Sequence, residues 1–354
     1  MYVSFIRRAN LSVFNRNTRL YPSVFTHKKL GFCLGVYFNF LTNKGLECLY
    51  QGHTQKFAAF VPSTKIKASM TLYPIHTGNF KLDGGAMFGV VPKGLWERTN
   101  PADEKNLCTW AMRSLLIEDG ERLILIDTGI GDKQSKKFFG HYHLHGDNSL
   151  DRSLASCGFG RNDITDVFLT HLHFDHVGGA VQWNKDRTGY VPAFSNARYW
   201  TNSRHWKWAT QPNGREKASF LKENIIPLEE SGQLHFIDTP EDSIRVDCGL
   251  GFEAFIVNGH TDAQMCPIIK YKGETLVFMA DLLPSTGHIP LPYVMGYDTR
   301  PLLTLQERTL IFTEAAEKNY HLFLEHDAYN EVCTLELTEK GPRLANSGRL
   351  DHYM

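Results

Sequence analysis

The sequence lacks several features that define common classes of protein. No stretch approaches the ~20 consecutive apolar residues of a membrane-spanning helix, so we expect no membrane span. The formal net charge is zero, with 38 Lys or Arg against 38 Asp or Glu, and this gives no sign of nucleic-acid binding. A GxSxG motif is also missing, so nothing indicates a serine nucleophile on a strand-to-helix elbow.

Cysteine is sparse and irregularly spaced. The seven cysteines are odd in number, and no two of them form a CxxC pair. We therefore expect neither a disulfide framework nor a cysteine-rich zinc site. Reduced, buried thiols in a cytosolic protein are the simplest interpretation.

The zero net charge hides an asymmetry between the first 69 residues and the rest. Residues 1–69 carry ten Lys or Arg and one Glu, whereas residues 70–354 carry 28 Lys or Arg and 37 Asp or Glu. A basic segment on an acidic body suggests targeting. Lys28 and Lys29 precede the apolar run 30–38, as in a secretory signal, but no small-x-small cleavage site follows.

Three interpretations of this N-terminal segment stay open. It is a secretory signal, an organellar transit peptide, or a segment outside the working protein, whose synthesis then starts at Met70. In each case we predict that residues 1–69 are a basic extension and that residues 70–354 form the folded, functional domain. We expect a cytoplasmic protein, or a secreted or periplasmic one if the extension is a signal.

Apolar runs of strand length alternate with helical patterns after Met70, and Asp119-Gly120 is a hairpin turn signal. A helix is predicted over 302–318, and a helical segment is predicted to open at 178–180. Longer insertions are expected at 130–160 and 183–230. This alternation predicts a layered α/β fold. The predicted strands are 113–118, 123–126, 167–170, 197–200, 234–237, 252–257, 267–271, 276–280 and 321–324.

A dense cluster of metal-binding side chains follows the strand predicted at 167–170. The six residues HLHFDH contain His171, His173, Asp175 and His176. In an extended segment His171 and His173 point to the same side, and a following turn would direct Asp175 and His176 to a second point. Imidazole and carboxylate suit zinc, and also iron, nickel or cobalt. The cluster could serve two adjacent ions but completes the coordination of neither.

Three further candidate ligands follow other predicted strands. His260 comes after 252–257, Asp281 directly follows 276–280, and His326 comes after 321–324. Loops at the ends of strands present functional groups on a rigid scaffold, so these ends are predicted to form one site with the HLHFDH segment. By contrast, no apolar strand precedes His141, His143 and His145, which are predicted to lie in an exposed loop.

These motifs together resemble the metallo-β-lactamase superfamily over about residues 70–340. The sequence 125–129 (LIDTG) is similar to the family's upstream strand and turn. The resemblance implies an α/β fold, an αββα four-layer sandwich with a dinuclear metal site at the sheet edge. It also implies that His171, His173 and His260 hold one ion, that Asp175, His176 and His326 hold the other, and that Asp281 bridges them.

Within the superfamily the chain most resembles the N-acyl homoserine lactonases, the quorum-quenching branch. This implies a metal-dependent carboxylic ester hydrolase that opens the lactone ring by attack of a hydroxide bridging two Zn²⁺ ions, with other divalent transition metals compatible. Asp175 and Asp281 are the implied catalytic residues. The alternatives are a thioesterase, a methyl-parathion-type esterase or a β-lactamase. A flavodiiron-like oxygen reductase would need a flavin domain, for which residues 70–354 leave no room.

The substrate is expected to be a small-molecule ester or lactone. Familiar lactonases often carry a Tyr three residues after the bridging Asp, where this chain has Pro284. His288, Tyr293 and Tyr297 are candidates to replace it. An acyl arm would need an apolar groove. The candidates are Met87, Phe88, Leu95 and Trp96 in the early loop, and Leu282, Leu283, Ile289, Pro290, Tyr293 and Met295 after Asp281. The sequence leaves open whether the protein forms a homodimer.

Overall fold

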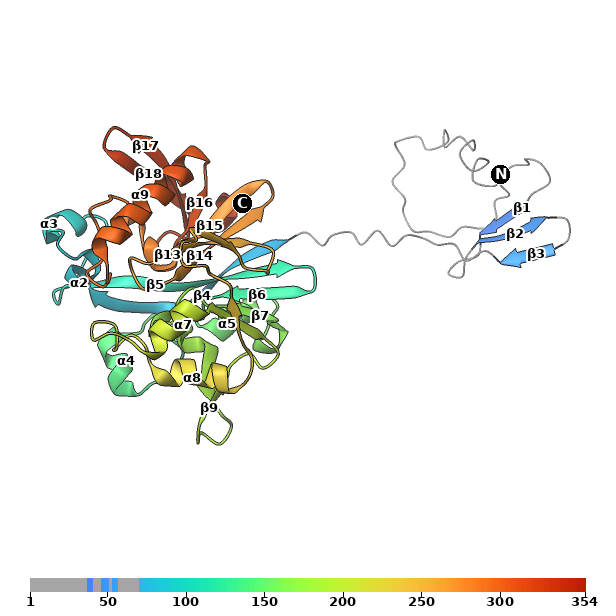
Figure 1. Ribbon diagram of the computed structural model, residues 1–354, viewed down its shortest axis with the longest axis horizontal. Helices are drawn as coiled ribbons and strands as arrows, with labels where there is room; N and C mark the ends of the chain where they lie inside the picture. Colours follow the sequence, from blue (N-terminus) through green and yellow to red (C-terminus); the bar gives the residue numbers. More distant parts are fainter. Residues whose placement is uncertain (1–36, 41–45, 51–52, 57–69) are drawn as a thin grey trace. The chain divides into compact units, whose positions relative to one another are not determined.

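The computed structural model describes residues 37–40, 46–50, 53–56 and 70–354. The chain divides into two units, Met1–Ile66 and Lys67–Met354. In the first unit, three short strands form an antiparallel sheet (Figure 1). They are β1 (Tyr37–Phe40), β2 (Leu46–Tyr50) and β3 (His53–Lys56). The predicted extension 1–69 lies largely outside the described residues, and its interpretation as a targeting signal stays a prediction.

Two β-sheets form the centre of the second unit. The six-stranded sheet has the order β11-β10-β7-β6-β5-β4, and the seven-stranded sheet has the order β12-β13-β14-β15-β16-β17-β18. The strands of the first sheet are β4 (Thr71–Asp83), β5 (Leu107–Asp119), β6 (Arg122–Ile126), β7 (Asp166–Phe168), β10 (Arg198–Asn202) and β11 (Leu234–Ile237). The strands of the second sheet are β12 (Arg245–Asp247), β13 (Glu253–Val257), β14 (Gln264–Tyr271), β15 (Glu274–Phe278), β16 (His321–Phe323), β17 (Val332–Thr338) and β18 (Gly341–Gly348). A separate hairpin is formed by β8 (Val181–Trp183) and β9 (Tyr190–Pro192).

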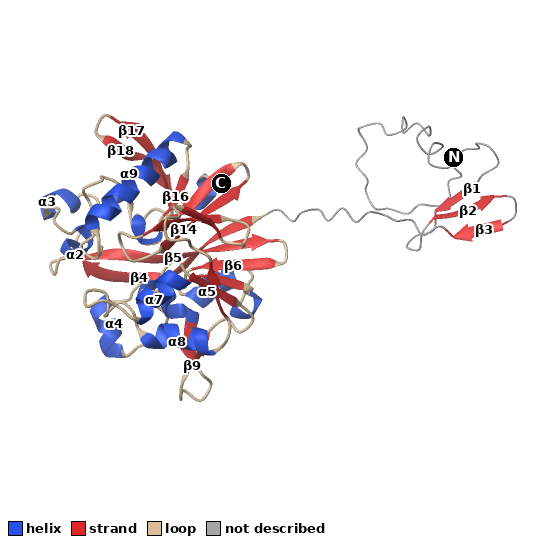
Figure 2. Ribbon diagram, viewed as in Figure 1, coloured by secondary structure: helices blue, strands red, loops and turns tan. Residues whose placement is uncertain are grey.

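Helices cover the outer face of each sheet, which gives the predicted αββα order (Figure 2). The first sheet packs against α5, α7 and α8, and the second sheet packs against α9. The α-helices are α2 (Gly84–Phe88), α3 (Lys93–Trp96), α4 (Lys136–Tyr142), α5 (Leu150–Ser156), α6 (Phe174–Val177), α7 (Ser203–Thr210), α8 (Lys222–Glu230) and α9 (Pro301–Glu317). Short 3₁₀ turns lie at Arg161–Asp163, Gly178–Ala180, Ala280–Leu282, Thr286–His288 and Leu350–His352.

Strand β6 shows why these elements form. Ile124 and Ile126 face the second sheet, while Leu125 faces the helices. Side chains alternate along a strand, so a strand buried on both faces must be apolar throughout. The strand predicted at 123–126 is confirmed for this reason.

Two predicted elements differ from the structure. The strand predicted at 113–118 runs from Leu107 to Asp119, because β5 pairs with β4 along its whole length. The helical segment predicted to open at 178–180 is wrong, because the helix α6 begins at Phe174 and these residues end it as a 3₁₀ turn before β8. The glycines serve close packing here, since a Cβ on Gly178 would lie 2.1 Å from the carbonyl oxygen of Ile130.

The two predicted insertions contain regular structure. Helices α4 and α5 occupy the first, and β9, α7 and α8 lie within the second. Helix α4 has no fully buried residue, which explains its weak sequence signal. The hairpin β17–β18 at the edge of the second sheet was also not predicted, because its strands are partly exposed and carry polar residues such as Glu336 and Arg343.

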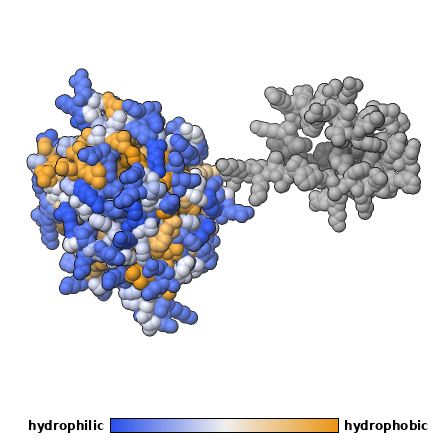
Figure 3. Space-filling view, viewed as in Figure 1, coloured by the Kyte–Doolittle hydropathy of each residue, from blue (hydrophilic) through white to orange (hydrophobic). Residues whose placement is uncertain are grey.

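One surface of the second unit is apolar. On the face shown in Figure 3, hydrophobic side chains gather over α9, where Leu302 is 77% exposed and Leu310 is 52% exposed. Contiguous apolar patches often mark contact sites. Among the described residues, no helix combines the length and the apolar character needed to cross a membrane.

Replacing Gly178 with Ala tests the close packing behind α6. We expect Gly178→Ala to lower the free energy of unfolding by about 1–3 kcal/mol, because the new Cβ meets backbone atoms that cannot turn away. Chemical denaturation measures the change. Gly140→Ala is the control, since a Cβ there meets nothing within 4 Å on an exposed helix, and should be neutral or stabilising. Equal stability of the two variants would contradict this account.

Candidate metal centre

The seven sequence-predicted ligands come from the ends of strands in both sheets. His171 and His173 follow β7 of the first sheet, and Asp175 and His176 lie on α6, which comes next. The other three follow strands of the second sheet: β13 leads to His260, β15 to Asp281 and β16 to His326. The sandwich therefore brings its two sheets together at this edge, and each sheet contributes to both halves of the candidate centre.

The ligand atoms of these residues form two compact groups. The first group is His171, His173, His260 and Asp281, and the second is Asp175, His176 and His326. Within each group the atoms lie within 4.8 Å of one another. All seven residues are at most 8% exposed. Burying this many polar groups is costly unless each has a partner.

The nitrogen atoms of the first group converge on one point. His173 Nδ1 lies 3.1 Å from His171 Nε2 and 3.1 Å from His260 Nε2. An imidazole nitrogen carries one proton or one lone pair, so it cannot satisfy two such neighbours by hydrogen bonding. Tetrahedral ligands about 2.0–2.1 Å from a zinc ion would lie about 3.3 Å apart. The observed separations therefore fit three nitrogens that share a metal ion.

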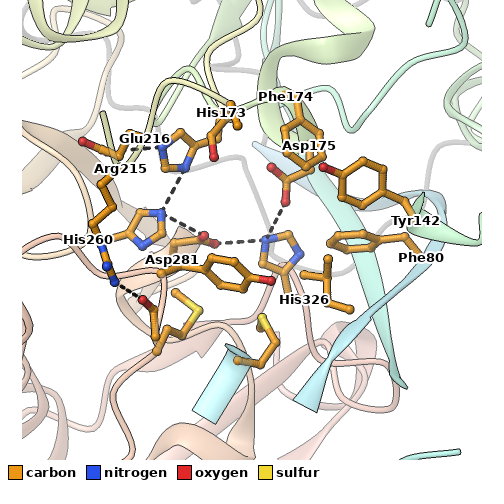
Figure 4. A pocket seen from close by; sticks show the side chains of 17 residues that line it. Phe80, Tyr142, His173, Phe174, Asp175, Arg215, Glu216, His260, Asp281 and His326 are labelled. Atoms are coloured by element: carbon orange, nitrogen blue, oxygen red, sulfur yellow. Dashed lines mark hydrogen bonds and ion pairs between the residues drawn. The ribbon is translucent and has the colours of Figure 1, made fainter. Parts of the chain in front are cut away.

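The carboxylate of Asp281 lies between the two groups. Its Oδ2 is 3.1 Å from His260 Nε2, and its Oδ1 is 3.0 Å from His326 Nε2 (Figure 4). The same Oδ1 is 3.4 Å from His176 Nε2. Asp175 Oδ2 completes the second group at 3.8 Å from the same His326 nitrogen. One oxygen of Asp281 facing each group is the arrangement that a bridging ligand requires.

Unpaired buried atoms support the fit to metal ions. Asp281 Oδ1 is buried without a geometrically satisfactory hydrogen bond in residues 70–354, although imidazole nitrogens are close to it. Buried polar atoms are nearly always hydrogen-bonded, so an exception needs an explanation. Imidazole and carboxylate are donors that zinc and other divalent transition metals bind. The donor set and its spacing thus fit one metal ion in each group.

The outward nitrogens of two candidate ligands are held by acceptors. His260 Nδ1 donates to Asp298 Oδ1 at 2.8 Å, and His326 Nδ1 donates to the carbonyl oxygen of Ala111 at 2.8 Å. Such contacts fix the tautomer, because the proton on Nδ1 leaves the Nε2 lone pair free for a metal. Asp298 is 38 residues from His260 and lies in no recognisable motif, so sequence reasoning missed it.

Two more carboxylates lie beside the outward nitrogens of His176 and His173. His176 Nδ1 lies 3.1 Å from Asp127 Oδ2, and the same carboxylate accepts from the backbone and hydroxyl of Thr170 at 2.8 and 2.6 Å. Glu216 Oε1 lies 3.4 Å from His173 Nε2. Asp127 belongs to the LIDTG motif noted in the sequence. Glu216 lies in the predicted insertion at 183–230, where no motif indicated a role for it.

The electrostatic environment differs among the candidate ligands. Burial works against the charged forms of His176, His260 and His326, yet neighbouring carboxylates raise the pKa of each above its usual value, so a metal ion would have to displace their protons. Burial, and then the charges of His176 and His173, hold the pKa of His171 well below its usual value, so that imidazole is neutral. Burial would raise the pKa of Asp281, but the neighbouring histidines hold it well below its usual range. Burial also works against the ionised form of Glu216, yet its contacts with His173 lower its pKa to about 2. Neutral imidazole and ionised carboxylate are the ligand forms that metals bind.

A cavity of about 350 Å³ lies above the candidate centre. Its floor includes His173, Asp175, His260, Asp281 and His326 (Figure 4). This volume is within the range of small-molecule sites. The remaining wall is mainly apolar and aromatic, and it is formed by Phe80, Leu82, Met87, Tyr142, Phe174, Met295 and Tyr297 with Arg215, Glu216, Ala218, Ser219 and Gly296.

The four predicted substrate contacts have different positions. Met87 lines the cavity, but Phe88, His288 and Tyr293 do not. His288 is fully buried, and its Nδ1 and Nε2 bond to Ser285 Oγ at 2.8 Å and to the Met87 carbonyl oxygen at 3.0 Å. Phe88 is also fully buried and stacks on His288 at 4.2 Å. These side chains belong to the core, so we no longer assign them to the substrate.

The histidine-rich segment at 141–145 contributes Tyr142 to the cavity, and none of its three histidines. His141 and His143 are exposed, as predicted, and none of the three histidines belongs to the metal-binding groups. The predicted loop is wrong in one respect, because Lys136–Tyr142 is the helix α4. Tyr142, between the histidines, packs on Phe174 with ring centroids 4.7 Å apart and lines the cavity.

The fold and the site together define the family. Residues 113–313 match the family model of the metallo-beta-lactamase superfamily. The chain belongs to this superfamily, as the sequence motifs predicted. It is a metal-dependent hydrolase in which the seven predicted ligands form two groups that could hold metal ions. No curated protein matches the chain in sequence.

Solved structures of the same fold include several hydrolases. A probable metal-dependent hydrolase from Staphylococcus aureus is 26% identical with a TM-score of 0.70, over 79% of this chain and 97% of that one. AidC, a dizinc quorum-quenching lactonase in complex with a product, N-hexanoyl-L-homoserine, is 21% identical with a TM-score of 0.62, over 78% and 94%. An N-acyl homoserine lactone hydrolase with the same product bound is 17% identical with a TM-score of 0.54, over 74% and 95%. At these identities the two lactonases show a shared fold.

Removing the central carboxylate tests the two-group arrangement. We expect Asp281→Ala to lose at least one of two bound metal ions and nearly all hydrolytic activity, because Asp281 faces both groups. Metal analysis of dialysed protein gives the number of ions per chain. Asp242→Ala, a change at an exposed carboxylate, should keep both ions. Two tightly bound ions in Asp281→Ala would contradict the bridging role.

Proposed function

We propose that residues 70–354 are a dinuclear zinc hydrolase that opens the ring of N-acyl homoserine lactones, with residues 1–69 outside the catalytic domain. The observation that carries this proposal is the apolar cavity above two adjacent metal-binding groups. Lactonases with products of this class bound share the fold, which supports the choice of substrate. His171, His173 and His260 are the proposed ligands of one ion, with Asp175, His176 and His326 for the other and Asp281 shared.

The proposed chemistry needs no side-chain nucleophile. Two zinc ions, when bound, would lower the pKa of a shared water toward about 7 and polarise the substrate carbonyl. Asp281, with one oxygen toward each group, would fix the position of the two groups relative to one another. Asp175 faces the cavity and would carry a proton to the departing alkoxide as the ester C–O bond breaks. In a lactone that alkoxide stays tethered, so the product is a single hydroxy acid.

The charges of the cavity wall favour a neutral substrate. Among the lining residues, all within the described part of the chain, Arg215 is the one Lys or Arg. Its guanidinium donates to the carbonyl oxygen of Gly296, and the adjacent residue Glu216 brings a carboxylate to the same wall that offsets the charge. Anionic thioesters such as glutathione conjugates, and β-lactams with their carboxylate, would need a free cation near the metals. An acyl homoserine lactone is neutral, and its acyl arm suits the apolar wall.

Two phenol hydroxyls lie within reach of a substrate. Tyr142 and Tyr297 line the cavity, and neither hydroxyl has a hydrogen-bond partner in residues 70–354. Figure 4 shows the hydroxyl of Tyr142 turned toward Asp175. Burial raises the pKa of both phenols to about 12, so they are protonated donors at neutral pH. We propose that they bind the carbonyl oxygens of the substrate, the role for which Tyr297, Tyr293 and His288 were the candidates from the sequence.

Proton release tests the proposed reaction. Zinc-loaded protein mixed with N-butanoyl, N-hexanoyl and N-dodecanoyl homoserine lactone should acidify a weakly buffered indicator solution, because ring opening yields an acid. Metal-free protein and the Asp281→Ala variant are the controls and should be silent. Silence of a protein shown to carry two metals would contradict the lactonase proposal. Parallel assays with a thioester, a phosphotriester and a β-lactam would then identify the substrate class.

Removing each phenol hydroxyl tests its contact with the substrate. We expect Tyr142→Phe and Tyr297→Phe each to lower kcat/KM about tenfold, because each removes a hydrogen bond of about 1–1.5 kcal/mol. Metal content should not change. Tyr190→Phe, on β9 away from the cavity, is the matched control. Unchanged kcat/KM in both variants would exclude these hydroxyls from substrate binding.

A further inference from the structure

Two buried arginines lie against the loops that carry His326 and Asp281. Arg113 on β5 is 2% exposed and Arg308 on α9 is fully buried. Within residues 70–354, no carboxylate lies at ion-pair distance from either guanidinium. Taking a cation out of water is expensive, so a buried guanidinium without an ion-pair partner must be held by other strong contacts.

Arg113 bonds to the backbone of the loop that carries His326. Its Nη1 donates to the carbonyl oxygens of Leu324 and, at 3.1 Å, of Asn330, and its Nη2 donates to that of Asp327 at 2.9 Å. The backbone of β5 adds two more contacts, from Arg113 N to the Glu325 oxygen and from Ala111 N to the His326 oxygen, each at 3.1 Å. The whole loop is thereby fixed to the first sheet, although it comes from the second.

Arg308 plays the equivalent part for the loop that follows Asp281. Its Nε donates to the carbonyl oxygen of Leu282 at 2.7 Å. Its Nη1 donates to those of His288 at 3.2 Å and Tyr293 at 2.7 Å. Three points of an irregular segment are thus tied to α9, and the first of them is the residue next to Asp281.

The guanidinium group is suited to this task in a way that lysine is not. Its planar fork presents five donors in fixed directions, so one side chain can reach several carbonyl groups at once. These carbonyls lie in buried loops outside the sheet ladders, where each needs a donor. The two positive charges also lie near a site rich in carboxylates, which lowers the repulsion among those carboxylates before cations bind.

We propose that Arg113 and Arg308 are positioning residues that hold the loops of His326 and Asp281 in metal-binding geometry before a metal ion arrives. The inference rests on the proposed metal ligands and is independent of the substrate. Because His326 belongs to the second group alone, Arg113 should affect the affinity for one metal ion. Asp281 faces both groups, so Arg308 should affect the affinity for both ions.

Zinc titration of the metal-free full-length chain against a chromophoric chelator tests this division. The variants are Arg113→Lys, Arg308→Lys and the control Arg245→Lys, whose guanidinium pairs with Glu314 away from the site. We expect Arg113→Lys to weaken one of two zinc ions about 10- to 100-fold, and Arg308→Lys to weaken both by a similar factor. The control should bind both ions as the wild type does.

The possible results separate this inference from the proposed centre. Wild-type affinity for both ions in Arg113→Lys and Arg308→Lys would overturn the positioning role and leave the metal centre intact. A wild-type chain that binds no zinc would overturn the centre and this inference together. If the arginines have a purely structural role, the variants should be less stable, but Arg113→Lys should not weaken one zinc ion while Arg308→Lys weakens two. That result would also contradict the proposal.

Hydrogen exchange on the metal-free wild type provides a second test that depends on no variant. If the arginines order the loops before a metal ion binds, the backbone amides of residues 282–293 and 324–330 should exchange more slowly than those of the hairpin turn at 184–189. Equal exchange of these loops and the turn would overturn the proposal. Circular dichroism of the lysine variants, measured in parallel, identifies any loss of fold.

Discussion

The arrangement of the whole site depends on one constraint, the convergence of seven buried polar side chains on two neighbouring points. His176, His260 and His326 each use one nitrogen for an acceptor in the surrounding protein and direct the other into a group. Asp281 stands between the groups with one oxygen toward each. No pairing of these atoms with one another satisfies them all, whereas a metal ion in each group does.

The sandwich makes this convergence possible because its two sheets meet at the same edge. The first sheet delivers the HLHFDH segment directly after β7, and the second delivers three loops from β13, β15 and β16. Loops have less intrinsic order than strands, so a precise site on loops needs support from the scaffold. Asp127, Asp298 and Glu216 orient individual rings, and the two buried arginines bond to the loop backbones. The apolar cavity above the centre then limits which substrate can approach.

Much of the fold and of the site could be predicted from the sequence, because the information is local. Strands such as β6 are apolar on both faces, and HLHFDH places four candidate ligands within a short segment. What could not be predicted depends on contacts between distant segments. Asp298 and Glu216 lie in no motif, and only the folded chain brings them to their histidines. His288 was a candidate because it follows Asp281 closely in the sequence, but its side chain bonds within the core. Tyr142 lines the cavity, but its segment was predicted to be an exposed loop because of its histidines.

The most direct test of the central claim is a crystal structure of the zinc-loaded protein with anomalous scattering recorded at the zinc edge. The account predicts two anomalous peaks about 3.5–4 Å apart. One peak should lie among His171, His173 and His260 and the other among Asp175, His176 and His326, with Asp281 in contact with both. A single peak, or peaks away from these groups, would contradict the dinuclear centre on which the account rests.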